Sequence, residues 1–118
     1  MQAVARGAKL AGGATVGILP GTSADEANPF IDFPIVTGMG EVRNAVVVRT
    51  SQAVIAVGGA YGTLSEIALA LRMGVPVIGL GTWKLKAPDG SVPPIWEAAS
   101  AADAVEKAFR AARNKNRY

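Results

Sequence analysis

Short runs of consecutive apolar residues divide the chain at regular intervals. The runs at 15–19, 54–57 and 75–80 have the length and composition of strands that are buried on both faces. A fourth run at 33–36 contains Pro34, which we expect to keep it from being a central strand. Continuous apolar strands of this kind are typical of a parallel sheet that helices cover on both sides.

The segments between these runs carry apolar residues at helical spacing. We expect a first helix over residues 1–11, ended by a pair of glycines, and a second over residues 40–50 with Thr37 as its N-cap. A third helix is expected over residues 64–73, where Gly74 would end it. Because helices and strands alternate along the chain, the pattern predicts an α/β fold.

The last helix is expected to open at Ser100, after a turn-rich stretch at 81–95. Ser100 and Asp103 stand in the spacing of a capping box, with Asp in the place of the usual Glu. Three residues at helical spacing would form its apolar face: Val105, Phe109 and Ala112.

The composition limits the chemistry that the chain can perform. Half of the 118 residues are apolar, which is enough for one domain with its own core. The chain has no cysteine and no histidine, so thiol nucleophiles, disulfides and thiolate metal sites are excluded. Acid–base chemistry must come from Asp, Glu, Lys, Tyr or a cofactor. A metal ion could be held only by oxygen ligands, and we predict no metal site.

The net charge of +3 comes from the end of the chain. Residues 1–106 hold seven basic and nine acidic side chains and sum to −2, whereas five basic residues follow them: Lys107, Arg110, Arg113, Lys115 and Arg117. A solvated helix end explains these charges without a partner, and we favour it over an arm that binds a polyanion. No apolar run approaches the length of a membrane span, so we expect a soluble, cytoplasmic protein.

A glycine-rich turn follows the apolar run at 54–57 and leads into a helix. Its residues are Gly58, Gly59, Ala60, Tyr61, Gly62 and Thr63. Glycines let the backbone approach a ligand closely, and the free N–H groups of a helix N-terminus bind phosphate. The pattern is neither the dinucleotide fingerprint nor the Walker sequence. By itself it fits a phosphate site and a tight structural turn equally well.

Two charged residues are candidates for the same site. Thr63 and Glu66 have capping-box spacing, so Glu66 could fold back onto the helix start, or it could face a sugar or reacting centre beside the phosphate. Arg43 could lie on a helix surface, or it could reach the crevice at the carboxyl ends of parallel strands and pair with phosphate or with Glu66. From the spacing alone we favour the helix cap for Glu66 and the helix surface for Arg43.

The run TGMGEVRN, followed by VIAVGGAYGTLSEIALALRMGVPVIGL, resembles the LOG-like, lysine-decarboxylase-like Rossmann family. The signature of that family is PGGxGTxxE, preceded by a helix that bears arginine. The chain is most similar to its molybdenum cofactor carrier-like branch and distantly similar to the DNA-processing protein DprA. The resemblance implies a single Rossmann-like nucleotide-binding domain over residues 1–118, a three-layer sandwich with a parallel sheet.

The resemblance also implies roles for the candidate residues. Some members of the family are nucleoside 5′-monophosphate phosphoribohydrolases, which cleave the bond between base and ribose. In such an enzyme Arg43 and Glu66 would be the catalytic pair, and the turn at 58–63 would hold the phosphate, chiefly through Gly59, Ala60, Gly62 and Thr63. A carboxylate beside ribose can stabilise oxocarbenium character.

The chain departs from the family pattern at three points, and the first two favour the carrier-like branch over the hydrolases. Ala60 stands where a glycine is expected, which restricts its backbone. Asn44 stands where the hydrolases usually have lysine. The strands, helix and first glycine-rich loop of the family would precede Met1, so we expect this sequence to be a fragment or to have a late start.

The expected function is therefore binding of a phosphorylated nucleotide or a molybdopterin-type cofactor at the glycine-rich turn. Phosphoribohydrolysis through Arg43 and Glu66 is the alternative. A DprA-like single-stranded DNA binder that uses residues 110–118 is a weaker third hypothesis. By family analogy we also expect a homo-oligomer, with the helices at 40–50 and 64–73 as its interface.

Overall fold

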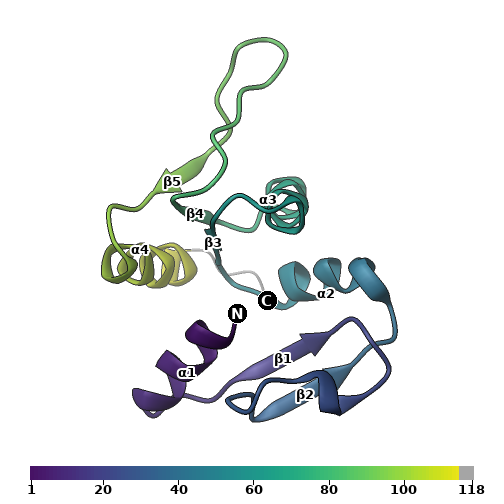
Figure 1. The fold of residues 1–118 in the computed structure, drawn as a ribbon. Coiled ribbons are helices and arrows are strands. Elements are labelled where there is room, and N and C mark those ends of the chain that lie inside the picture. Colours follow the sequence, from purple (N-terminus) through teal and green to yellow (C-terminus); the bar gives the residue numbers. More distant parts are fainter. Residues whose placement is uncertain (115–118) are drawn as a thin grey trace. The chain divides into compact units, whose positions relative to one another are not determined.

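A computed structural model describes residues 1–114 of the chain, in which helices alternate with strands and all paired strands run parallel (Figure 1). This confirms the predicted α/β class. The residues form two compact units, Met1–Val46 and Val47–Tyr118. The single domain expected over residues 1–118 stays a prediction, and each unit is described by itself.

The first unit contains α1 (Gln2–Leu10), β1 (Val16–Leu19) and β2 (Phe33–Val36), with a short 3-10 helix, η1 (Ala24–Glu26), between the strands. The two strands pair in parallel, with Val16 opposite Phe33 and Leu19 opposite Val36. Gly12 has a φ of +81°, as expected of a glycine that ends a helix.

Asp32 links three parts of the first unit. Its carboxylate accepts a hydrogen bond from the backbone N–H of Thr15 at 2.9 Å and forms an ion pair with Lys9 of α1 at 2.9 Å. The Lys9 ammonium and the Thr15 N–H hold the pKa of the Asp32 carboxyl below its usual value. Helix α1 is thereby joined to the start of β1.

The helix expected over residues 40–50 begins differently from the prediction. A 3-10 turn, η2 (Gly40–Val42), comes first, and α2 (Arg43–Thr50) follows it. Thr37 is not the N-cap, because that position belongs to Met39. The Thr37 hydroxyl instead donates to the carbonyl oxygen of Leu19 at 2.6 Å, which ties the segment to the end of β1.

The second unit is a three-stranded parallel sheet with a helix on each face (Figure 1). Its strands stand in the order β3 (Val54–Val57), β4 (Val77–Leu80) and β5 (Ile95–Glu97). The helices are α3 (Tyr61–Met73), which follows β3, and α4 (Ala101–Asn114), which follows β5. The turn-rich stretch at 81–95 did not predict β5, since Pro93 and Pro94 directly precede this short strand.

Neighbouring residues of β4 point to opposite faces of the sheet and separate two cores. Val77 packs in a cluster with Ile67 and Ala70 of α3, whereas Ile78 packs against Ala104 and Ala111 of α4. Since successive side chains of a strand alternate between its faces, α3 and α4 must cover opposite faces.

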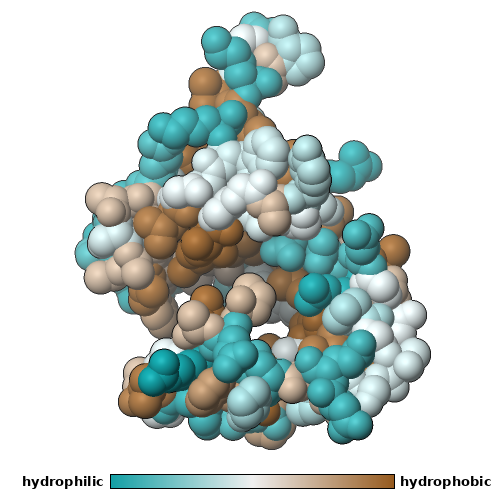
Figure 2. Space-filling model, in the orientation of Figure 1, coloured by the Kyte–Doolittle hydropathy of each residue, from teal (hydrophilic) through white to brown (hydrophobic). Residues whose placement is uncertain are grey.

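Only β4 of the second unit fits the prediction of a strand buried on both faces. Along β3, Val54 and Ala56 are buried, while Ile55 and Val57 are 39% and 56% exposed. Helix α4 likewise turns the predicted apolar face outward, because Val105 and Phe109 are 47% and 62% exposed. Figure 2 shows apolar surface over α4 and β3 of this unit.

The face of α4 that does pack against the sheet consists of alanines, Ala104 and Ala111, with Ala108 beside them. Alanines let the helix backbone approach β4 closely, and hydropathy alone does not single them out from larger residues. The Ser100 cap is confirmed, since its hydroxyl accepts from the Asp103 N–H at 3.1 Å. The Asp103 carboxylate accepts from the N–H of Ala99 at 2.9 Å, one residue before the position that a capping box uses.

Candidate functional site

The glycine-rich turn joins β3 to α3 in three residues. Gly58 has a φ of +81°, which favours glycine. Ala60 is the N-cap of α3, with φ −70° and ψ 156°, so alanine fits this position without strain. The replacement of a family glycine by Ala60 therefore does not distort the turn.

Three backbone N–H groups precede the first hydrogen bond within α3. That bond runs from the N–H of Leu64 to the carbonyl oxygen of Ala60, at 3.1 Å. Among residues 1–114, the N–H groups of Tyr61, Gly62 and Thr63 have no hydrogen-bond partner. Free N–H groups at the positive end of a helix dipole are donors of the kind that bind anions.

Packing within the protein does not explain two of the glycines. A Cβ atom at Gly59 or Gly62 would meet nothing within 4 Å, and neither residue has a positive φ. Gly62 lies inside α3, where glycine costs about 1 kcal/mol of helix stability relative to alanine. What these glycines provide is open space at the positions that a Cβ would occupy.

Two residues that follow β4 support the turn. The Thr82 hydroxyl donates to the carbonyl oxygen of Gly58 at 2.6 Å, and the indole N–H of Trp83 donates to the carbonyl oxygen of Ala60 at 3.2 Å. The rings of Trp83 and Tyr61 are stacked, with centroids 6.0 Å apart and planes at 27°. Thr82 and Trp83 thus bind two carbonyl oxygens of the turn, while the N–H groups of Tyr61, Gly62 and Thr63 have no partner among the described residues.

Sequence reasoning missed Thr82 and Trp83, although a signal was present. Both residues follow the predicted strand at 75–80, and the carboxyl ends of neighbouring parallel strands meet at one edge of a sheet. Residues just after that strand should therefore have been counted with the glycine-rich turn, which follows the adjacent strand.

Glu66 does not belong to a capping box with Thr63. Helix α3 begins at Tyr61 rather than Leu64, so Thr63 is already its third residue and Ala60 is the N-cap. Thr63 and Glu66 lie three residues apart on one side of the helix, and helical side chains lean toward the N-terminus. Glu66 is half-buried and lies one turn beyond Gly62 and Thr63.

Arg43 is anchored in the first unit. Its Nη1 donates to the carbonyl oxygen of Ile18 in β1 at 2.7 Å, which ties the start of α2 to that strand. The guanidinium has further N–H donors that this bond does not use. Arg43 and Glu66 belong to different units, so their pairing stays a prediction.

The carboxyl edge of the second sheet also contains a cavity of about 200 Å³. Thr82 and Trp83 line it together with Lys84 and Glu97, whose side chains form an exposed ion pair at 3.4 Å. No residue of the glycine-rich turn lines this cavity, but Thr82 and Trp83, which contact the turn, do.

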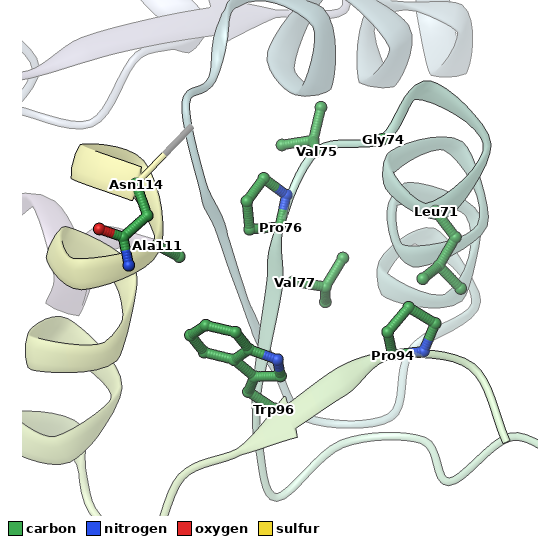
Figure 3. A pocket seen from close by; sticks show the side chains of 9 residues that line it. All are labelled: Leu71, Gly74, Val75, Pro76, Val77, Pro94, Trp96, Ala111 and Asn114. Carbon is green, nitrogen blue, oxygen red and sulfur yellow. The ribbon is translucent and has the colours of Figure 1, made fainter. Parts of the chain in front are cut away.

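A larger cavity of about 360 Å³ lies at the opposite edge of the sheet (Figure 3). Pro76 and Val77 at the start of β4 line it, with Trp96 of β5 and Leu71 of α3. Its lining is mostly apolar and contains no residue of the glycine-rich turn. It is separate from the glycine-rich turn.

Metal-binding clusters and membrane-spanning helices are both absent from the described part of the chain. Within residues 1–114, no cluster of three or more acidic side chains could hold a metal ion. Over the same residues, no helix has the length and apolar character of a membrane span.

Comparison with known proteins gives relatives over most of the chain. An uncharacterized protein of Archaeoglobus fulgidus is 51% identical over 80 residues, which are 68% of this chain and 52% of that protein. The chain thus spans about half the length of this curated relative.

Solved structures of similar fold include two proteins with a described ligand. The molybdenum cofactor binding protein from Rippkaea orientalis is 37% identical, with a TM-score of 0.78 over 90% of this chain and 67% of its own. The molybdenum cofactor carrier protein from Chlamydomonas reinhardtii is 34% identical, with a TM-score of 0.79 over 98% of this chain and 72% of its own.

A family model matches nearly all of the described residues and assigns the chain to a family. A model of the SLOG cluster4 family matches residues 1–112, which include the glycine-rich turn and both units. The chain belongs to the SLOG cluster4 family.

Proposed function

We propose that this chain binds a phosphorylated cofactor of the molybdopterin type, or a nucleotide, through its phosphate at the glycine-rich turn. The proposal rests on the free N–H groups of Tyr61, Gly62 and Thr63. Open space at Gly59 and Gly62 accompanies them. The similarity to a molybdenum cofactor binding protein and a carrier protein supports the cofactor over other phosphorylated ligands.

The chemistry of the turn suits a phosphate better than a neutral group. Each N–H can donate to a phosphate oxygen, and the helix dipole adds a favourable interaction with negative charge. Thr82 and Trp83 hold the carbonyl oxygens of Gly58 and Ala60, and a hydrogen-bonded carbonyl is less free to turn its negative end toward the anion.

The test is native mass spectrometry of the full chain, purified without added ligand. We expect a retained small molecule with the mass of a molybdopterin-type cofactor or a nucleotide. In Gly62→Asp, a carboxylate would occupy the space of the phosphate, and the retained molecule should be lost.

Ala68→Asp is the matched control, because Ala68 is exposed on the same helix six residues further on. This variant adds the same charge to α3 and should keep the ligand. Retention of the ligand by Gly62→Asp, in a folded protein, would contradict the proposal.

Phosphoribohydrolysis is the second candidate function, and the position of Glu66 favours it. Glu66 lies one helical turn beyond Gly62 and Thr63, on the helix that begins at the glycine-rich turn. In this reaction water adds to the anomeric carbon of a nucleoside 5′-monophosphate, the bond to the base nitrogen breaks, and the base leaves with a proton. Glu66 would stabilise the oxocarbenium character, and Arg43 would contact the phosphate or Glu66.

The enzyme hypothesis is tested by incubating AMP with the full chain and measuring released ribose 5-phosphate. If the hypothesis is right, the wild type releases ribose 5-phosphate and Glu66→Gln reduces the rate by at least about 100-fold, as expected for a group acting at the reacting centre. Release that persists unchanged in Glu66→Gln would rule out this role of Glu66.

A further inference from the structure

Next to the proposed phosphate site is a pair of aromatic rings that phosphate binding alone does not use. We propose that Tyr61 and Trp83 form a stacking platform for a planar heteroaromatic ring, of the purine or pterin class, in the ligand whose phosphate binds the turn. This inference rests on the proposed function and extends it from the phosphate to the ring system.

Packing does not explain the position of Tyr61. Its side chain is largely in solvent, since the residue is 82% exposed, whereas Trp83 is half-buried against the core of the second unit. Trp83 is also fixed by the hydrogen bond from its indole N–H to Ala60. The pair therefore consists of an anchored ring and an exposed ring that rests on it.

The exposed ring has one face toward Trp83 and the other face open. The ring centroids are 6.0 Å apart, which is too close to admit a third ring between them, because two stacking steps need about 7 Å. A ligand ring would instead lie on the outer face of Tyr61. Stacking of a base on an aromatic side chain is worth about 1–3 kcal/mol and accepts any planar ring.

One ligand can reach both the platform and the phosphate site. Tyr61 is the first residue of α3, and its own backbone N–H is one of the three free donors. Backbone and side chain of the same residue would thus contact the phosphate and the ring. Nucleotides and phosphorylated pterins have this combination, in which a few atoms separate a phosphate from a planar ring.

The experiment compares two probes that differ only in the base: GMP and ribose 5-phosphate. Isothermal titration of the full chain gives the ratio of their affinities. We expect GMP to bind more tightly, and we expect Tyr61→Ala to reduce this ratio about tenfold. Tyr61→Phe keeps the ring and should preserve the ratio.

Phe109→Ala is the matched control, because it removes an aromatic ring from an exposed site on α4 of the same unit. It should leave both affinities unchanged.

An unchanged ratio in Tyr61→Ala would overturn the platform and leave the phosphate site intact. Failure of the phosphate site would look different: ribose 5-phosphate would bind equally well to Gly62→Asp. If the wild type binds neither probe at millimolar concentration, both proposals are wrong.

Discussion

At the scale of single residues, the clearest sign of a binding site is a glycine that the fold does not need. Gly62 lies in the first turn of α3 with an ordinary φ, and a Cβ there would meet no atom within 4 Å. A glycine at such a position lowers the stability of the helix. Gly7 of α1 has the same open space, so this feature alone does not mark a site. Gly62 differs because it lies among the three free N–H groups at the start of α3, where we propose that a ligand approaches.

Gly62→Ala should therefore raise stability and weaken binding in the same protein. The free energy of unfolding should increase by up to about 1 kcal/mol, because alanine is the better helix former. The affinity for ribose 5-phosphate should fall, since the new methyl group enters the open space. Gly7→Ala in α1 is the control: Gly7 also has no atom within 4 Å of a Cβ. That variant should raise stability without a change in affinity, as measured by urea unfolding and titration.

Asp32 gives the first unit a defined dependence on pH. Its hydrogen bonds and its ion pair with Lys9 lower the pKa of the carboxyl in the folded state. The folded state then favours the carboxylate, so this contribution to stability is present above the ordinary pKa of Asp and is lost as the pH falls through the lowered value.

Asp32→Asn should consequently lower the melting temperature at pH 7 and bring it closer to the wild type at low pH. The loss should narrow as the pH falls below 3.8, the ordinary pKa of an Asp carboxyl, and through the lowered pKa of Asp32. Asp25→Asn is a suitable control, because over residues 1–114 the Asp25 side chain has no ion pair or hydrogen bond. A difference between Asp32→Asn and the wild type that is independent of pH would contradict the assignment.

At the scale of elements, local sequence patterns predicted whether a segment is a helix or a strand more accurately than they predicted its first residue. The strand, glycine-rich turn and helix at 54–73 were predicted as such, but α3 starts three residues early, at Tyr61. The spacing of Thr63 and Glu66 resembles a capping box, and this local signal competes with the contacts that Trp83 makes with Ala60 and Tyr61. Those contacts come from a different part of the chain, which no local pattern reveals.

Helix α4 shows the same limit, and its packing can be tested. Its inner face is made of alanines, with Ala104 only 1% exposed against Ile78. Ala104→Leu should overpack this contact and destabilise the protein by about 1–3 kcal/mol. Ala102→Leu, at an exposed position of the same helix, should change stability by less than about 0.5 kcal/mol. If urea unfolding instead found Ala104→Leu neutral and Phe109→Ala costly, the larger apolar residues would form the inner face.

At the scale of the whole molecule, the alternation of helix and strand predicted the α/β class, and motif resemblance predicted the relatives. What could not be predicted is the division into two compact units, whose boundary falls inside the residues of α2. Periodicity describes one element at a time and contains no information on how many contacts cross between elements. For the same reason the expected homo-oligomer, through the helices at 40–50 and 64–73, stays a prediction.

The distribution of charge over the chain argues against a role in binding DNA. Two of the five basic residues after Glu106 are paired on α4 itself: Lys107 with Asp103 at 3.0 Å, and Arg110 with Glu106 at 2.8 Å. Lys115 and Arg117 lie outside the described residues. Removal of residues 110–118 would be a poor test of a DNA-binding tail, because Ala111 is buried against the sheet and its loss would damage the fold.

A sharper test keeps Ala111 and neutralises the three remaining charges, in the triple variant Arg113→Gln, Lys115→Gln and Arg117→Gln. We expect the wild type to bind a single-stranded 20-mer only weakly at low salt and the variant to bind with nearly the same affinity, as measured by fluorescence anisotropy. A tail that contacts phosphates would behave otherwise, because each contact adds a slope of about −0.7 to the plot of log affinity against log salt concentration. A steep slope in the wild type that the triple variant loses would establish a nucleic-acid-binding tail, whereas equal and shallow slopes would confine ligand binding to other parts of the chain, with the glycine-rich turn as the proposed site.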